Sequence, residues 1–228
     1  MKYDVILFDA AETLFTTRGT VGEIYGEVAR RYGSTSSSED IQFAFLRQFR
    51  HSGPLTGDDE KKWWRDVVYR VFEDVGMISN FDQFFDEVYE EFRDARGWRL
   101  FPETMEVLEE LRQRKYTLGV ISNFDSRIYS VLGSLKILEF FSSITISSET
   151  GYAKPHPGIF KAAIRAAGVP ASRILYIGDS LDNDVQAGAA AGLQTILIDR
   201  HARYSAIGSV ATIQNLRELL NQILTRSR

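Results

Sequence analysis

Short apolar runs alternate with amphipathic segments along most of this 228-residue chain. Each run is rich in residues that favour strands, and such a run is typical of a buried strand in a parallel sheet. The runs are residues 3–8, 117–121, 143–147, 174–178 and 195–198. Strands that alternate with helices form βαβ units, in which helices cover both faces of a parallel sheet. The pattern therefore predicts an α/β fold with three layers.

Helix signals fill most of the intervals between these runs. Residues 102–115 begin with Pro102 and Glu103, and their apolar side chains then recur at helical spacing. Further helices are predicted over residues 157–168, 181–191 and 213–226. Glycines follow the first two of these, which is a common way for a helix to end.

Residues 16–97 break the alternation, because they contain no convincing strand. Four helix-like stretches fill this region: residues 20–32, 39–50, 59–76 and 81–94. The segments 16–19 and 95–100 are the predicted hinges. Residues 1–15 and 98–228 are therefore expected to form the α/β core, and residues 16–97 an all-helical insertion.

Composition and charge exclude several classes of function. The net charge of −4 leaves no basic surface for nucleic acid, so no nucleic-acid partner is expected. The chain has no cysteine, which excludes disulfides, thiolate metal sites and cysteine nucleophiles. Its apolar N-terminal run is interrupted by Asp4 and Asp9, and no run has the length of a membrane span. We expect a cytoplasmic monomer with no membrane partner.

Polar residues stand where the predicted strands end. In an open α/β sheet the ligand binds beyond the carboxyl ends of the strands. Each residue alone could be a helix cap, but the whole set in this order is improbable by chance. The set comprises Asp9 and Thr13 after the first strand, Ser122 and Asn123 after the second, Lys154 after the third, and Asp179 and Asp184 after the fourth.

These residue types suit phosphoryl transfer. A carboxylate such as Asp9 can attack phosphorus and form a phospho-aspartate, which divides one difficult displacement into two easier steps. Because the nucleophile and the phosphate are both anionic, a hard cation is needed, and Mg²⁺ prefers oxygen ligands. Asp9, Asp179 and the backbone carbonyl of Ala11 are the expected ligands, and Asp184 helps to hold the site.

The other polar residues of the set would hold the substrate. Lys154 supplies a fixed positive charge against the carboxylates and the phosphate. Ser122, with backbone N–H groups near it, would donate hydrogen bonds to phosphate oxygens, and Thr13 and Asn123 lie in the same set. The expected partner is a small phosphorylated molecule.

Four segments resemble, in order, the signature motifs of the haloacid-dehalogenase-like superfamily: FDAAETLF, VISNFDSR, GYAKPHPGIF and YIGDSLDNDVQAGAAAG. The last is highly specific. The resemblance implies a Rossmann-like core, with residues 16–97 as the small helical cap that closes over the substrate. The stretches KKWWRDVV and ISNFDSR resemble the rhythmically expressed gene 2-like branch.

One position departs from the family's phosphatases. They carry a second aspartate two residues after the nucleophile, where it protonates the leaving alcohol and then activates water. Here that residue is Ala11. General acid–base help of this kind is worth on the order of 10²–10⁴-fold in rate. The nearest carboxylate is Glu12, for which a solvated turn position is the favoured interpretation.

Two relatives with other chemistry also lack that aspartate. Haloacid dehalogenases use no metal, so Asp179 would be idle, and Arg18 does not obviously align with their substrate-binding arginine. Phosphonoacetaldehyde hydrolases carry alanine at this position and use a cap lysine to form an imine. Lys61 and Lys62 are the only cap lysines, and they begin a charged helix.

A third alternative is a regulatory protein that binds phosphate and Mg²⁺ without useful turnover. The alanine at position 11 favours this alternative, and the otherwise complete set of Asp9, Lys154, Asp179 and Asp184 argues against it. Aromatic residues of the insertion are expected mainly to form its own core, with one or two facing the cleft. They are Phe43, Phe45, Phe49, Trp63 and Trp64. Arg127 is expected either to touch the substrate or to pair with a nearby acidic residue.

Overall fold

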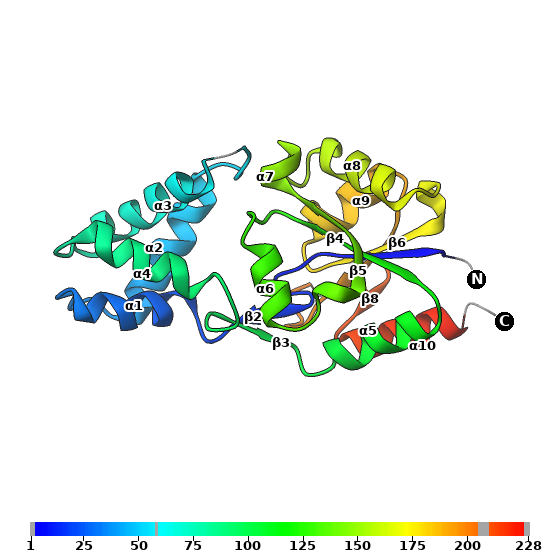
Figure 1. The fold of residues 1–228 in the computed structure, drawn as a ribbon, viewed down its shortest axis with the longest axis horizontal. Coiled ribbons are helices and arrows are strands. Elements are labelled where there is room, and N and C mark those ends of the chain that lie inside the picture. The colour runs from blue at the N-terminus through cyan, green and yellow to red at the C-terminus, as the bar shows by residue number, and fades with distance from the viewer. Residues whose placement is uncertain (1–2, 58, 205–209, 226–228) are drawn as a thin grey trace.

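The computed structural model describes residues 3–57, 59–204 and 210–225 (Figure 1). Its largest sheet has the strand order β5-β4-β1-β6-β7-β8, and every neighbouring pair is parallel. The predicted parallel sheet is therefore confirmed. Its strands are β1 (Val5–Phe8), β4 (Thr117–Ser122), β5 (Phe141–Ile146), β6 (Ile174–Gly178), β7 (Gln194–Ile198) and β8 (Thr212–Ile213).

Helices cover both faces of this sheet, as the sequence pattern predicts. Because successive side chains of a strand point to opposite faces, Ile6 and Phe8 join one apolar cluster and Val5 and Leu7 join another. The first cluster includes residues of α5 (Thr104–Gln113), α6 (Ile128–Ser134) and α10 (Leu216–Thr225). The second includes residues of α8 (Pro157–Ala167), with α9 (Ala187–Ala190) packed against it. The core is a three-layer α/β sandwich.

The region between the first and second predicted strands of the core is mainly helical. It contains α1 (Val21–Arg31), α2 (Ser38–His51), α3 (Glu60–Val75) and α4 (Phe81–Glu91), which we call the cap helices. They lie beside the core, on the left in Figure 1. Their interior is apolar and aromatic, and Phe72 and Phe84 are fully buried with their ring centroids 4.7 Å apart.

The expectation that no strand occurs in residues 16–97 was wrong at the N-terminal edge, where Thr16 and Thr17 belong to a strand. Strand β2 (Phe15–Thr17) pairs antiparallel with β3 (Trp98–Leu100), so the two predicted hinges form one two-stranded ribbon. Each strand has only three residues, and its partner is about 80 residues away in the chain. Their pairing is therefore a tertiary contact that no local pattern reveals.

Other boundaries also differ from the sequence prediction. The helix expected over 181–191 is a wide π-helical turn, η3 (Leu181–Gln186), followed by α9. The segment at 213 belongs to β8, so α10 begins only at Leu216; its predicted last residue, 226, lies outside the described residues. Short elements complete the chain: α7 (Ser147–Thr150), η1 (Leu138–Phe140) and η2 (Ala171–Arg173). Within the described ranges no helix is both long and apolar enough to cross a membrane.

Candidate active site

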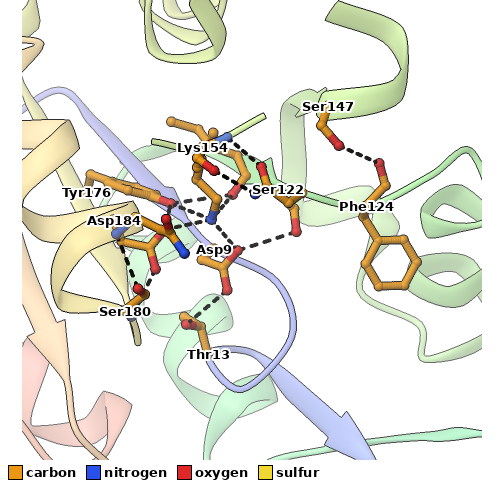
Figure 2. A network of polar contacts seen from close by, with 12 residues as sticks. Asp9, Thr13, Ser122, Phe124, Ser147, Lys154, Tyr176, Ser180 and Asp184 are labelled. Carbon is orange, nitrogen blue, oxygen red and sulfur yellow. Dashed lines mark hydrogen bonds and ion pairs between the residues drawn. The ribbon is translucent and has the colours of Figure 1, made fainter. Parts of the chain in front are cut away.

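Three strands of the sheet end in the polar residues that the sequence marks out. Asp9 directly follows β1, Ser122 is the last residue of β4, and Asp179 directly follows β6. Because these strands are adjacent and parallel, their carboxyl ends meet at one edge of the sheet. Asp9 is 6% exposed there, at the centre of the polar network in Figure 2.

Lys154 joins two of the carboxylates. Its Nζ donates to Asp9 Oδ1 and to Asp184 Oδ1, each at 2.6 Å, and to the hydroxyl of Tyr176 at 3.0 Å (Figure 2). The Tyr176 hydroxyl in turn donates to Asp184 Oδ1 at 2.6 Å. An unpaired charge at this depth would be strongly unfavourable, so the ammonium and the two carboxylates stabilise one another.

Burial and charge act in opposite directions on Asp9. Burial and the neighbouring carboxylates of Asp184 and Asp179 together raise the pKa of Asp9 to about 7, against the attraction of Lys154. Burial alone would lower the pKa of Lys154, but Asp184 and Asp9 hold it above its ordinary value. Lys154 therefore stays protonated, while Asp9 needs additional positive charge to remain fully ionised at neutral pH.

Asp179 completes an acidic cluster with Asp9 and Asp184. One carboxylate oxygen from each lies within 4.8 Å of the others, which is the chemistry and spacing of an oxygen-only site for a hard cation. Burial raises the pKa of Asp179, although Arg203 donates to its Oδ2 at 2.9 Å and acts in the opposite direction. The donor set therefore fits Mg²⁺.

Gly178 lets this cluster form. A Cβ atom at that position would lie 2.4 Å from Cβ of Asp184, closer than real contacts allow. The absence of a side chain therefore lets Asp184 pack against the end of β6. The backbone N–H of Ser180 donates to Asp184 Oδ2 at 3.0 Å and helps to hold the carboxylate there.

Three further sequence-predicted residues lie around Asp9. The Ser122 hydroxyl is 3.3 Å from Asp9 Oδ1, and the Thr13 hydroxyl is 3.5 Å from Asp9 Oδ2. Asn123 has a different contact: its side-chain amide makes two hydrogen bonds with the backbone of Lys154. Ser122 and Thr13 thus donate toward the Asp9 carboxylate, whereas Asn123 holds the Lys154 loop.

The loop after Asp9 carries the departure at Ala11. Its neighbour Glu12 has a φ of 62°, in the left-handed region that a side chain disfavours. The carboxylate of Glu12 accepts a hydrogen bond from Thr16 at 2.6 Å, so it is held by this loop. Ala11 and Glu12 both line a cavity that residues of the cap helices also line.

Arg200 braces that strained loop, and sequence reasoning missed it. Its guanidinium donates to the backbone oxygens of Glu12 and Thr13, at 3.2 and 2.7 Å, and forms a buried ion pair with Glu103 at 2.8 Å. Sequence reasoning also missed Tyr176, which the apolar run of β6 marked only as a core residue. Arg200 lies outside the four signature segments. Tyr176 begins the segment YIGDSLDND, but the notable residues of that segment were its aspartates, and nothing in it indicates a contact with Lys154.

A cavity of about 550 Å³ separates the cap helices from the carboxyl edge of the sheet. Phe45, Phe49 and Trp64 line it; Phe43 and Trp63 do not. Arg127 also lines it and pairs with Asp125 at 2.6 Å, which is the second of the two roles expected for it. Trp64 donates from Nε1 to the same carboxylate at 2.6 Å, and this contact connects α3 to the core.

Residues 3–192 match the family model described as haloacid dehalogenase-like hydrolase. The chain is similar to haloacid dehalogenase-like hydrolase domain-containing protein 3 of Xenopus laevis, with 30% identity over 87% of this chain and 85% of the relative. It is 26% identical to the rhythmically expressed gene 2 protein of Drosophila melanogaster, over 86% of this chain and 83% of that protein. The resemblance to this branch is confirmed.

Among solved structures, the L-2-haloacid dehalogenase RSc1362 has the same fold, with a TM-score of 0.80. It is 20% identical over 98% of this chain and all of that one, which is a likeness of fold alone. The family model, by contrast, covers most of the chain and includes each residue of the acidic cluster. The chain belongs to the haloacid dehalogenase-like hydrolase family.

Proposed function

We propose that this hydrolase is a Mg²⁺-dependent phosphatase of a small phosphorylated molecule, with Asp9 as its nucleophile. The observation that carries the proposal is the acidic cluster of Asp9, Asp179 and Asp184, with Lys154 bridging two of its members. Such a cluster holds a nucleophile, a cation site and a fixed positive charge within one buried volume.

The residues divide the reaction in two steps. A carboxylate oxygen of Asp9 forms a bond to phosphorus while the ester P–O bond breaks, and the leaving oxygen takes the electron pair. Water then attacks the phosphorus of the phospho-aspartate and passes a proton to a phosphate oxygen, the bond between phosphorus and Asp9 breaks, and inorganic phosphate leaves. Lys154 offsets negative charge throughout, and the hydroxyls of Ser122 and Thr13 donate to phosphate oxygens.

The cation site would be formed by Asp9, Asp179 and Asp184, with the Ala11 carbonyl as a further ligand. Mg²⁺ bound there would reduce the repulsion between the carboxylate and the phosphate dianion. It would also favour the ionised form of Asp9, whose pKa burial and the neighbouring carboxylates otherwise raise to about 7. The Arg203 contact to Asp179 occupies one carboxylate oxygen and leaves the other for a cation.

Ala11 limits which substrates such a site hydrolyses well. An alkyl alcohol leaves as a basic alkoxide that needs a proton, and Ala11 cannot supply one. An aryl or acyl leaving group forms a stable anion and does not need that proton. We therefore expect turnover of aryl and acyl phosphates, and slow turnover of alkyl phosphates.

Contacts in the structure disfavour two of the alternatives. Arg18 donates from Nε to the backbone oxygens of Ala95 and Trp98, at 2.7 and 3.0 Å. These contacts hold its guanidinium against the β2–β3 ribbon, which disfavours a role in binding a haloacid substrate. Lys61 and Lys62 are exposed, pair with Asp86 and Asp66, and do not line the cavity, which disfavours imine formation. Ala11 is the observation that favours a binding protein without useful turnover.

Phosphate release from phenyl phosphate and acetyl phosphate, with and without Mg²⁺, tests the proposal. We expect Mg²⁺-dependent release and a beryllium fluoride adduct on Asp9. Asp9→Asn is nearly isosteric but a poor nucleophile, and should lower kcat by about 10⁴- to 10⁶-fold. Full activity without added metal, or an adduct on another residue, would contradict the proposal. Binding of phosphate and Mg²⁺ without any release would leave the binding protein in its place.

A further inference from the structure

The cavity between the cap helices and the core is lined on its core side by residues that neighbour the proposed reaction residues in the sequence. Ala11 and Asn123 line it on the side of the core. Each of the cap helices also contributes lining residues, including Tyr25 of α1, Phe45 of α2 and Trp64 of α3. Its volume of about 550 Å³ is within the range typical of small-molecule sites. A group attached to a phosphate at Asp9 would extend into this space.

Aromatic rings form a large part of the cavity wall. Phe49 stacks on Phe45 and on Trp64, with ring centroids 5.5 and 5.8 Å apart. Trp98 and Phe124 continue the wall on the core side, with centroids 5.6 Å apart. Because these rings pack on one another, the wall is already ordered, and a flat apolar group could stack on it at little entropic cost.

The charged residues that line the cavity are Glu12 and Arg127. Arg127 is neutralised, because its Nε and one terminal nitrogen donate to both carboxylate oxygens of Asp125, at 2.9 and 2.6 Å. A second anionic group on the ligand would therefore meet a compensated cation and the carboxylate of Glu12. The lining favours an uncharged ligand group.

From this lining we infer that the cavity holds the leaving group of the substrate, and that the substrate is a phosphate monoester of an uncharged aromatic alcohol larger than one ring. This inference rests on the proposed phosphatase function, since it assigns the part of the substrate that Asp9 does not touch. In the reaction the bond between phosphorus and the aryl oxygen breaks, and the aryloxide departs with the electron pair. The flat aromatic wall favours such a group because an aromatic ring can stack on it. Ala11 favours it because an aryloxide is a stable anion that needs no proton from the protein.

Phenyl and 2-naphthyl phosphate separate shape from leaving-group chemistry, because their alcohols have similar acidity but differ by one ring. We expect kcat/KM to be at least about tenfold higher for 2-naphthyl phosphate, since the second ring is removed from water against the wall. Equal values for the two esters, or a preference for a sugar phosphate over both, would overturn the inference.

Helix α2 offers matched variants for the same test. Phe49 lines the cavity and is 44% exposed, whereas Phe43, on the same helix, is 72% exposed and does not line it. Phe49→Ala should lower the 2-naphthyl-to-phenyl ratio of kcat/KM by about tenfold, and Phe43→Ala should leave it unchanged. Leu46→Gln, at a second half-exposed lining position, should lower the ratio as well and protects the test against misfolding of one variant. Equal ratios in the wild type and both lining variants would overturn the inference.

Calorimetric binding to Asp9→Asn with Mg²⁺ present distinguishes this inference from the proposed function. If 2-naphthyl phosphate binds more tightly than phenyl phosphate but the wild type hydrolyses neither, the assignment of the cavity as an aromatic site is supported and the phosphatase proposal is overturned. Turnover of both esters without a preference in kcat/KM or in affinity supports the phosphatase and overturns the cavity. If the protein neither binds nor hydrolyses either ester, both the cavity inference and the phosphatase proposal are overturned.

Discussion

The core and the cap helices use charge in opposite ways. In the core, Lys154 pairs with Asp9 and Asp184, and Arg200 pairs with Glu103, with every side chain less than a tenth exposed. The ion pairs of the cap helices lie at the surface, as in Lys61–Asp86 and Arg65–Asp82. Surface pairs contribute little to stability, whereas removing one partner of a buried pair leaves an uncompensated charge.

The aromatic side chains of the cavity and the charged side chains of the acidic cluster come from different parts of the molecule. Most rings that line the cavity come from the cap helices, while the acidic cluster and its lysine come entirely from the core. Under the proposed function, the core would provide charge for the reaction, and the cap helices would provide shape for selecting a substrate. Substitutions in the acidic cluster should affect all substrates alike, and substitutions at the aromatic residues of the cavity should change the ranking among substrates.

The largest effect expected after loss of the nucleophile comes from Asp179→Ala. It removes one of the three carboxylates of the cluster, so Mg²⁺ binding measured by calorimetry should be lost. Release from phenyl and 2-naphthyl phosphate should fall together, to background. Asp182→Ala is the control, because Asp182 lies three residues away in η3 and outside the cluster. Unchanged Mg²⁺ affinity in Asp179→Ala would show that the cation site is elsewhere.

A smaller effect, and of opposite sign, is expected from Ala11→Asp. Ala11 lines the cavity, so a longer side chain there has room beside the leaving group. The variant should recover part of the roughly 10²–10⁴-fold that general acid catalysis provides, chiefly for alkyl phosphates. Recovery should be incomplete, since the residues that surround an alanine at this position were not shaped to orient a carboxylate.

Glu12→Gln is the control for that experiment. Glu12 is held by Thr16, so we expect its loss to change turnover little. A large loss in Glu12→Gln would mean that Glu12 already transfers the proton. If Ala11→Asp gave no gain on any alkyl phosphate while Glu12→Gln was silent, the impaired-phosphatase hypothesis would fail.

Residues that follow strands could be predicted from the sequence because the geometry of a parallel sheet brings strand ends together. The structure accordingly collects Asp9, Ser122, Asp179, Asp184 and Lys154 at one edge. Contacts that depend on distant segments could not be predicted. The β2–β3 ribbon joins residues about 80 positions apart, and Arg200 reaches the Asp9 loop from 187 or more residues away. Such pairs leave no periodic signal.

The smallest expected effect concerns Glu103, which belongs to the buried Arg200 pair of the core. Burial alone would raise the pKa of Glu103, but the hydrogen bond from Arg200, with backbone donors including Leu216, holds it below the ordinary value of 4.5. Glu103→Gln keeps the size of the side chain and removes its charge. It should lower the free energy of unfolding at pH 7 by about 1.5–3 kcal/mol, the range for hydrogen bonds to charged groups.

The dependence of this effect on pH follows from the direction of the shift. A carboxyl whose pKa is lower in the folded state contributes stability above its unfolded pKa and loses it as pH falls through the folded value. Because Gln does not titrate, the difference between wild type and Glu103→Gln should be constant above about pH 5 and shrink below pH 4.5. Urea unfolding at several pH values measures it. Glu106 lies in α5, which begins directly after Glu103, and pairs with Arg217 at the surface, so Glu106→Gln should change stability by less than about 1 kcal/mol. An equal loss in the two variants would contradict the assignment of stabilising charge to the buried core, and a constant difference down to pH 3 would show that the Glu103 carboxylate is not its source.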